Sequence, residues 1–469
     1  MIHKLVDNEI ELIKSLSNLK NVEIEDNNKI GLAYTHGVLS KHSIRGFILD
    51  IESNYHISLD DFSTNRLVSY NDTIRLNLLA HHISRDVTIS ENVIIKNKFS
   101  IINFHEEKFS NSANYYCRNV IPIKRYPNQS ALGFNNIIDG TKYKYGNGII
   151  TNGLLKVEIS NMIFEIFIID KYEEQFLFID CLHHLTPDLF GEFAWSILIG
   201  IGYLIGTIPQ DDVYSFYYEN EHLESYITYQ YKEARPTLKT IYHPINANPH
   251  SWINDFDEAQ RFWQTIPTIS FTQLSILCQL IHDEEDIKVV LLLMMESLTR
   301  THLLMPAGLS IVLESLTEFL SDKATVKPIS NEIVAVEFRN ELILILEKYK
   351  DNNDFKKGYD VIKSKINQIN TPTNSEKLKA PFSHFGINLT KIDEDAIKYR
   401  NAFLHGNVLL KKPKGEKQYQ MDSSEISLRL VTLINCIVMK MIGYNGAVLN
   451  HVKIQSQYTA KEIAEDYYR

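Results

Sequence analysis

Cysteine is scarce in this sequence, with 4 in 469 residues. The four lie far apart, at Cys117, Cys181, Cys278 and Cys436. No two of them have the spacing that zinc ligands or a disulfide framework require. The segment after Met1 also lacks the apolar stretch of a signal peptide. These absences predict a cytoplasmic protein without disulfides and with neither a metal nor a cofactor.

A hydrophobic run long enough to span a bilayer is also missing. The run from Phe193 to Gly206 has 14 residues, whereas a membrane helix needs about 20. Glu192 precedes this run and Pro209 follows it. Its three glycines would allow neighbouring backbone to pack closely. We therefore predict a buried helix at about 186–206 and no role in a membrane.

An excess of positive charge is the third absence. The 48 Lys and Arg residues are outnumbered by 58 Asp and Glu residues, which gives a net charge of −10. This charge argues against a general nucleic-acid binder, because phosphate contacts dominate that affinity. One short segment departs from the trend, with lysines at Lys411, Lys412, Lys414 and Lys417. Taken alone, such a cluster is most often a solvated loop.

The composition is otherwise that of a globular protein, with 44% hydrophobic and 23% charged residues. The length suggests two or three domains. Up to about residue 180 apolar and polar residues alternate, and turn dipeptides such as Asp139-Gly140 and Asn147-Gly148 interrupt them. This pattern predicts a β-rich, sandwich-like N-terminal domain over residues 1–235.

The second half of the chain has helical patterns. Prolines at 236, 244 and 249 indicate a linker over residues 236–260. Beyond it, apolar residues recur at helical spacing, which predicts a helical domain over residues 261–469. The helices are expected near 308–320, 331–349, 354–369, 391–405 and 423–442. The fold class is therefore α+β, with a β-rich domain followed by an all-α bundle.

The end of the helix expected at 391–405 contains a chemically suggestive segment, Arg400-Asn401-Ala-Phe-Leu-His405-Gly406. Arginine and histidine suffice to cleave RNA without a metal. A fixed cation stabilises the charged phosphate, and a group that titrates near neutrality moves the proton of the 2′-hydroxyl. The bare pattern also occurs at Arg75 and His81, but in a segment rich in β-type residues that we interpret as structural.

Helical geometry adds to the argument for this segment. Four apolar residues lie within about 60° of Arg400 on a helical wheel, namely Ala396, Ile397, Phe403 and Leu404. Arg400 is thus in the apolar stripe. Asn401 precedes His405 by four residues, so its amide could orient the imidazole. A purely structural reading, with a core arginine paired to a buried glutamate beside a capping histidine, fits the residue types equally well.

The segment resembles the Arg-polar-x-x-x-His motif of HEPN-domain ribonucleases, and the chain layout resembles the ApeA-like abortive-infection proteins of anti-phage defence. This resemblance covers roughly the C-terminal 200 residues. It implies a metal-independent endoribonuclease toxin with Arg400, Asn401 and His405 as catalytic residues. It also implies a homodimer formed through the HEPN domain, because such motifs pair across two chains and this chain has one convincing copy.

Two further features acquire a role if the resemblance holds. Glu314 lies on a strongly apolar helix and could support the site as a partner of Arg400, although an exposed glutamate fits its position equally well. The four lysines from Lys411 to Lys417 could steer the RNA substrate. The β-rich domain would then act as a sensor or regulator, with a phage-derived trigger as its possible ligand.

Alternatives from other classes remain open. The helical domain could be a non-catalytic HEPN scaffold, joined to a β domain that binds a ligand or a protein. The β domain could also be a carbohydrate- or protein-binding module. For the RNA target, tRNA is one option.

Overall fold

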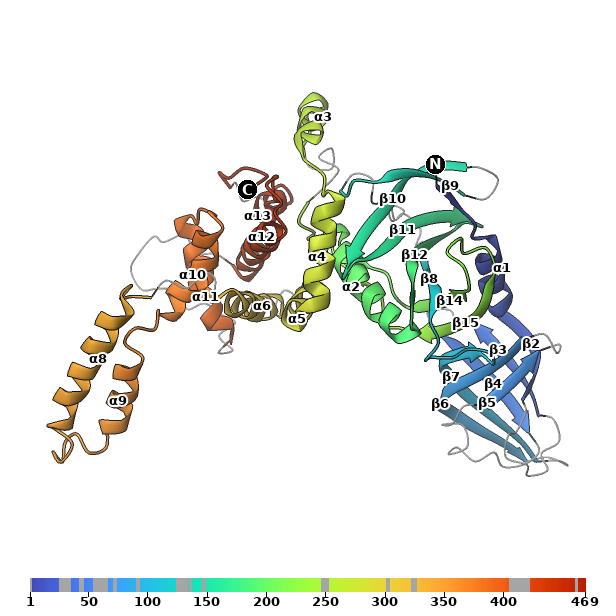
Figure 1. Cartoon of the computed structure of the whole chain (residues 1–469), viewed down its shortest axis with the longest axis horizontal. Helices are drawn as coiled ribbons and strands as arrows, with labels where there is room; N and C mark the ends of the chain where they lie inside the picture. The colour runs from blue at the N-terminus through green and yellow to red at the C-terminus, as the bar shows by residue number, and fades with distance from the viewer. Residues whose placement is uncertain are drawn as a thin grey trace. The chain divides into compact units, whose positions relative to one another are not determined.

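The computed structural model describes residues 2–24, 35–41, 46–53, 66–70, 74–89, 93–123, 134, 137–145, 149–245, 253–300, 304–321, 327–404, 422–459 and 463–469. It confirms the α+β prediction, with strands first and helices after them (Figure 1). The chain divides into two compact units, residues 1–288 and 289–469. The division lies inside helix α5 (Glu285–Leu298).

The strands of the first unit follow one another along most of its length. They are β1 (Ile2–Lys4), β2 (Asn18–Ile24), β3 (Thr35–Lys41), β4 (Phe47–Ser53), β5 (Arg66–Tyr70), β6 (Ile74–Ile89), β7 (Val93–Glu106), β8 (Tyr115–Ile123), β9 (Thr141–Tyr145), β10 (Ile149–Ile159), β11 (Met162–Lys171), β12 (Glu174–Leu185), β13 (Thr207–Ile208), β14 (Asp212–Tyr218), β15 (Tyr226–Glu233) and β16 (Leu238–Lys239). Four helices accompany them: α1 (Asp7–Leu16), α2 (Pro187–Ile205), α3 (Phe256–Thr265) and α4 (Phe271–Asp283).

Fourteen strands form one continuous sheet in the order β1-β9-β10-β11-β12-β8-β14-β15-β7-β4-β3-β2-β5-β6. The last strand, β6, also pairs with β7, so the six strands from β7 to β6 close on themselves as an antiparallel barrel. The first half of β7 pairs with β4, and its end pairs with β15. Strand β7 therefore belongs to both the barrel and the rest of the sheet, which leaves no edge between them.

The central strands of the sheet, among them β11 and β12, are buried on both faces. Helix α1 places Ile10 and Ile13 in a core with Phe178 and Tyr218, which lie on one face of β12 and β14. The other face packs against α2 and α4, where Phe164 of β11 contacts the ring of α2 residue Phe193 with centroids 5.4 Å apart. Burial on both faces explains why β11 and β12 contain nearly continuous apolar runs.

Helix α2 confirms the predicted buried helix at about 186–206. Among the described residues, it alone has the length and composition to cross a membrane, and 67% of its most apolar window is buried inside the protein. Gly202 explains part of this packing, because a Cβ there would lie 2.3 Å from Ile208. Such burial is typical of the core helix of a soluble protein.

A buried ionic cluster attaches α1 to the sheet. Arg118 of β8 is 1% exposed and donates hydrogen bonds to Asp180 at 2.7 and 3.0 Å and to Glu9 of α1 at 2.8 Å. Lys4 adds a second cation, 2.7 Å from Asp180 and 2.7 Å from Glu165. The three carboxylates face two cations, so no charge of the cluster is buried alone. It fixes the position of α1 and β1 on the sheet.

The helical unit begins in the C-terminal part of α5. Its other helices are α6 (Met305–Phe319), α8 (Glu332–Glu347), α9 (Tyr359–Asn367), α10 (Asn374–His384), α11 (Lys391–Leu404), α12 (Ser423–Met441) and α13 (His451–Ser456). Helices α6, α11 and α12 pack against one another, and α10 packs on α6. The predicted helices near 308–320, 331–349, 391–405 and 423–442 are confirmed to within a few residues.

The boundary between the units lies further along the chain than the linker predicted at 236–260. Helix α4 explains the difference, because it packs against β10 and α2. Ser275 and Gln279 of α4 accept hydrogen bonds from the backbone amides of Glu158 and Ser160, at 3.0 and 2.7 Å. Helices α3 and α4 therefore belong to the first unit.

Candidate active site

Helix α11 carries the first part of the Arg400–His405 segment. Arg400 and Asn401 lie near its C-terminal end, and the helix ends at Leu404. The structure describes the backbone at these two positions but not their side chains. His405 and the four lysines from Lys411 to Lys417 lie outside the described residues. The helix is thus confirmed, while the geometry among Arg400, Asn401 and His405 stays a prediction.

The residues one turn before position 400 lie on the buried face of α11. Ala396 and Ile397 are 0% and 1% exposed, on the face that packs against neighbouring helices. Because residues three and four apart share a helix face, helical geometry predicts position 400 on that face and position 401 about 100° away from it. The competing match at Arg75 and His81 lies within strand β6, as its β-type neighbours indicate.

Helix α6 brings Glu314 into the same part of the unit. It packs against α11 and α12, and its apolar residues Leu313 and Leu316 are fully buried. Glu314 itself is half-buried. It therefore lies on a helix adjacent to the one that carries Arg400. Whether its carboxylate supports Arg400 stays a prediction.

The first turn of α11 is fixed by a reciprocal cap. The Thr390 hydroxyl accepts a hydrogen bond from the Asp393 backbone amide at 3.2 Å. The Asp393 carboxylate accepts hydrogen bonds from the Thr390 amide and hydroxyl, both at 2.8 Å. This arrangement satisfies backbone donors that a helix start leaves unpaired. The sequence contains this signal as Thr390-x-x-Asp393.

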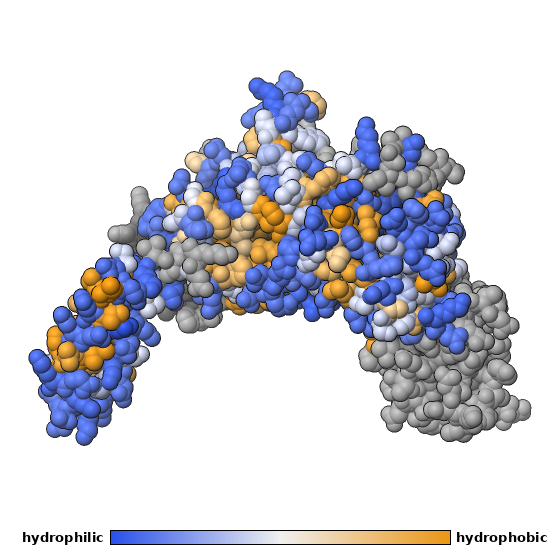
Figure 2. Space-filling view, viewed as in Figure 1, coloured by the Kyte–Doolittle hydropathy of each residue, from blue (hydrophilic) through white to orange (hydrophobic). Residues whose placement is uncertain are grey.

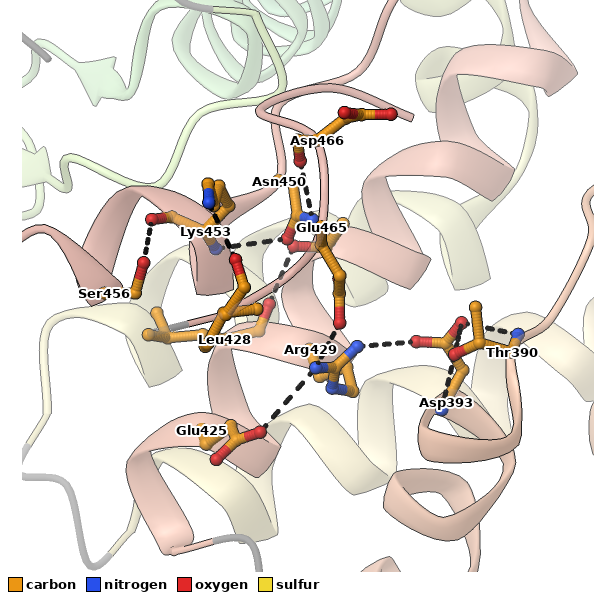
Figure 3. A network of polar contacts seen from close by, with 12 residues as sticks. Thr390, Asp393, Glu425, Leu428, Arg429, Asn450, Lys453, Ser456, Glu465 and Asp466 are labelled. Atoms are coloured by element: carbon orange, nitrogen blue, oxygen red, sulfur yellow. Dashed lines mark hydrogen bonds and ion pairs between the residues drawn. The ribbon is translucent and has the colours of Figure 1, made fainter. Parts of the chain in front are cut away.

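Asp393 joins α11 to α12 through Arg429, as Figure 3 shows, and to the 463–469 segment through Arg469. Its carboxylate accepts a hydrogen bond from Arg429 of α12 at 3.1 Å and one from Arg469 at 2.7 Å. Glu465 bridges the same two arginines, at 2.7 Å from Arg429 and 3.2 Å from Arg469. Glu425 lies 3.6 Å from Arg429. Two cations and three carboxylates thus hold the start of α11, the middle of α12 and the 463–469 segment together.

Burial makes this cluster costly to disturb. Asp393 is 0% and Arg429 1% exposed, and a buried charge requires an opposite charge to remain ionised. Burial alone would raise the pKa of Asp393, but the hydrogen bond and charge of Arg469 outweigh it and lower that pKa. Burial likewise opposes the ionisation of Glu465, whose pKa is lowered by Arg429 and Asn450. Both carboxylates are therefore ionised at neutral pH.

The sequence alone does not reveal this cluster. Arg429 lies in an apolar helix between Leu428 and Leu430, the same context that singled out Arg400. Its partners Asp393 and Glu465 lie 36 residues away on either side, so only the fold brings them together.

The described residues do not form a metal-binding group or a reactive thiol site. In the parts of the chain that the structure describes, no group of three or more His, Cys, Asp or Glu side chains could hold a metal ion. All four cysteines are buried, and burial raises the pKa of the Cys436 thiol to about 12. None of these thiols is therefore suited to act as a nucleophile at neutral pH.

Comparison with known proteins finds no family model, no curated protein and no solved structure that matches this chain.

Proposed function

We propose that this chain is a metal-independent endoribonuclease of the HEPN type, which acts in the cytoplasm as the toxic component of an anti-phage abortive-infection system. One observation supports the proposal above the others. The segment from Arg400 to His405 begins on a helix within an all-helical unit, and Ala396 and Ile397, one turn before Arg400, are buried. The adjacent helix α6 adds a half-buried carboxylate at Glu314.

The mechanism follows from the chemistry of these residues. Arg400 donates charge-assisted hydrogen bonds to the scissile phosphate and stabilises the charge that develops on it. The 2′-oxygen attacks phosphorus, and the bond from phosphorus to the 5′-oxygen breaks. The 2′-hydroxyl loses a proton and the leaving 5′-oxygen gains one; His405 carries out one of these two transfers and solvent water the other. Asn401 orients His405 or binds the phosphate. The products are a 2′,3′-cyclic phosphate and a 5′-hydroxyl.

The buried cluster around Asp393 has a positioning role in this scheme. It fixes the first turn of α11 two helical turns before position 400. A rigid helix start reduces the freedom of the residues that must hold the phosphate. The lysines from Lys411 to Lys417 would raise the local concentration of RNA near a chain that is otherwise acidic.

The test is cleavage of total RNA by wild type, Arg400→Ala and His405→Ala, with the cut ends mapped. Both substitutions should abolish cleavage and host toxicity while circular dichroism stays unchanged. His81→Ala is the matched control, since it removes the same side chain from the competing match in β6. EDTA should leave wild-type cleavage unchanged.

Two outcomes contradict the mechanism. One is cleavage by the Arg400→Ala/His405→Ala double variant, and the other is loss of wild-type cleavage in EDTA. Wild type that neither cleaves RNA nor slows host growth would favour the alternative, a HEPN scaffold without catalysis. The mapped ends would also separate a tRNA target from ribosomal RNA or mRNA.

A further inference from the structure

A groove with a volume of about 640 Å³ lies on the first unit, between helix α1 and the start of strand β15. Sites for small ligands have volumes of roughly 300–1,000 Å³. Four residues of α1 and two at the start of β15 line the groove: Asn8, Glu11, Leu12, Ser15, Ser225 and Tyr226. The residues proposed to cleave RNA all belong to the second unit, so a ligand site here would be separate from the nuclease site.

Helix α1 forms one wall of the groove and is fixed from its opposite side. Its four lining residues are three or four positions apart and therefore share one face of the helix. On the other side, Glu9 accepts a hydrogen bond from Arg118 at 2.8 Å and another from the hydroxyl of Tyr218. Ile10 and Ile13 are buried in the core beneath the helix. The wall is thus in place before any ligand binds, which lowers the entropic cost of binding.

The other wall is fixed by the turn that precedes β15. The backbone amide of Leu223 donates to the carbonyl oxygen of Asn220 at 3.3 Å, and that of His222 donates to the Asn220 side chain at 3.2 Å. Leu223 is buried in the core. The half-buried Tyr226 ring packs on Phe216 with centroids 5.2 Å apart. Tyr226 therefore presents a fixed aromatic surface to the groove.

Several polar side chains of the lining have hydrogen-bonding capacity that the described part of the chain does not use. Within that part, the Asn8 amide, the Ser225 hydroxyl and the Tyr226 hydroxyl have no hydrogen-bond partner. Glu11 accepts hydrogen bonds with Oε1 only, from the hydroxyl of Tyr172 and from Lys171 at 3.4 Å. The groove therefore offers a ligand one amide, two hydroxyls and the Oε2 atom of a carboxylate.

The protonation states of the groove provide both donors and acceptors at neutral pH. The hydrogen bond from Tyr172 lowers the pKa of Glu11, so its carboxylate remains an ionised acceptor. Burial, together with the negative charge of Glu9, raises the pKa of Tyr226, so its hydroxyl remains a donor.

The charges at the groove favour a neutral ligand. The lining contains neither Lys nor Arg, and the exposed Glu224 lies next to Ser225 in the sequence. A phosphate or an RNA strand would find no cation in this lining. A cationic ligand would gain little, because Lys171 already offsets part of the charge of Glu11. On the face shown in Figure 2, hydrophilic side chains predominate where Figure 1 places α1, so little apolar surface is available there for a protein partner.

A sugar ring combines the properties that remain. Its hydroxyl groups both donate and accept hydrogen bonds, and the C–H groups of one face form an apolar surface that packs on an aromatic ring. We propose that the groove binds a neutral carbohydrate, with a sugar ring stacked on Tyr226 and its hydroxyl groups bonded to Asn8, Glu11 and Ser225. Most of the lining residues are exposed, so we expect weak binding in which part of the sugar stays hydrated.

Saturation-transfer NMR with the full chain tests this inference. The probes are neutral trisaccharides of glucose, galactose, mannose and N-acetylglucosamine, each at millimolar concentration. We expect at least one to bind, and calorimetry then measures its affinity. Tyr226→Ala should weaken binding by about tenfold or more, because it removes the stacking surface. Tyr226→Phe keeps the ring and should bind within about threefold of wild type.

A second pair of variants tests the polar contacts. Glu11→Gln should weaken binding about fivefold, since a carboxylate accepts stronger hydrogen bonds than an amide. Asp7→Asn is the matched control, because both carboxylates are exposed on α1 and bind Lys171, but Asp7 does not line the groove. It should bind as wild type does. Both substitutions are on the surface, so this comparison decides the question even if Tyr226→Ala fails to fold.

Three outcomes would overturn the inference. The first is a chain that binds none of the four trisaccharides. The second is equal affinity in wild type, Tyr226→Ala and Glu11→Gln, which would place the sugar elsewhere on the protein. The third is binding of trilysine in place of a sugar, which would assign the groove to a basic peptide. None of these measurements involves RNA cleavage, so their results are independent of the proposed ribonuclease.

Discussion

Asp393 and Arg429 form a buried ion pair, 3.1 Å long, that joins the first turn of α11 to the middle of α12. The same carboxylate caps its own helix through Thr390 and binds Arg469. One side chain therefore orients the helix that carries Arg400 and connects three segments of the unit. Removing it would affect all three connections together.

Asp393→Asn should destabilise the helical unit by about 3–5 kcal/mol, because it removes one of the two carboxylates that the buried Arg429 shares with Arg469 and weakens the cap of α11. Hydrogen exchange of α11 and α12 amides in the full chain would measure this loss. Asp395→Asn is the control. Asp395 lies on the same helix, but its ion pairs with Lys391 and Lys398 are partly exposed and 3.7 Å long. Its loss should cost less than about 1 kcal/mol. If Asp393→Asn and Asp395→Asn destabilised the helical unit equally, the anchoring role of Asp393 would be contradicted.

The cluster also predicts how the helical unit responds to acid. The folded-state pKa values of Asp393 and Glu465 are lowered below their unfolded values of about 4. Their contribution to stability is thus complete above about pH 5 and is lost as the pH falls through the lowered pKa values. Thermal unfolding between pH 6 and pH 3 should show this loss. Asp393→Asn should flatten the dependence, and an unchanged profile in that variant would contradict the assignment.

Local periodicity was sufficient to predict much of the helical unit. Helices α6, α8, α11 and α12 follow from apolar residues three and four positions apart. Helix α1 has the same signal, with Val6, Ile10 and Ile13 all buried, but it is only 10 residues long and lies among strands. Periodicity alone therefore does not distinguish this short helix from the strands around it.

Features that depend on distant pairings could not be predicted in this way. The barrel closes only because β6 pairs with both β5 and β7. Arg118 and Arg429 each bind a carboxylate that is distant in the sequence. The apolar residues around each arginine indicate that it is buried, but they do not identify its partner. For Arg400 the sequence indicates the chemistry and the helix, whereas the positions of His405 and of a second chain depend on geometry beyond that helix.

The turn between β11 and β12 provides a prediction about stability. Tyr172 and Glu173 both adopt positive φ, 54° and 62°, as a two-residue hairpin turn requires. Asn and Gly are the usual residues at such positions. A glutamate whose backbone has positive φ destabilises the folded state by about 1 kcal/mol. Glu173→Gly should therefore stabilise the first unit by about 0.5 kcal/mol after the entropic cost of glycine. Asn161→Gly, in the turn between β10 and β11, should stabilise the first unit less, because asparagine tolerates positive φ. A lower melting temperature for Glu173→Gly would contradict the argument.

Glu314 allows the proposed site to be tested from a second helix. If its carboxylate supports Arg400 across the contact between α6 and α11, Glu314→Gln should lower the rate of RNA cleavage about tenfold, equivalent to about 1.4 kcal/mol in the barrier. Glu318→Gln is the matched control, since Glu318 lies one turn further along α6 and is exposed. It should cleave at the wild-type rate. Single-turnover cleavage of a defined RNA measures both. Equal rates for the two variants would assign Glu314 to the packing of the helical unit, and Arg400 would then act without support from α6.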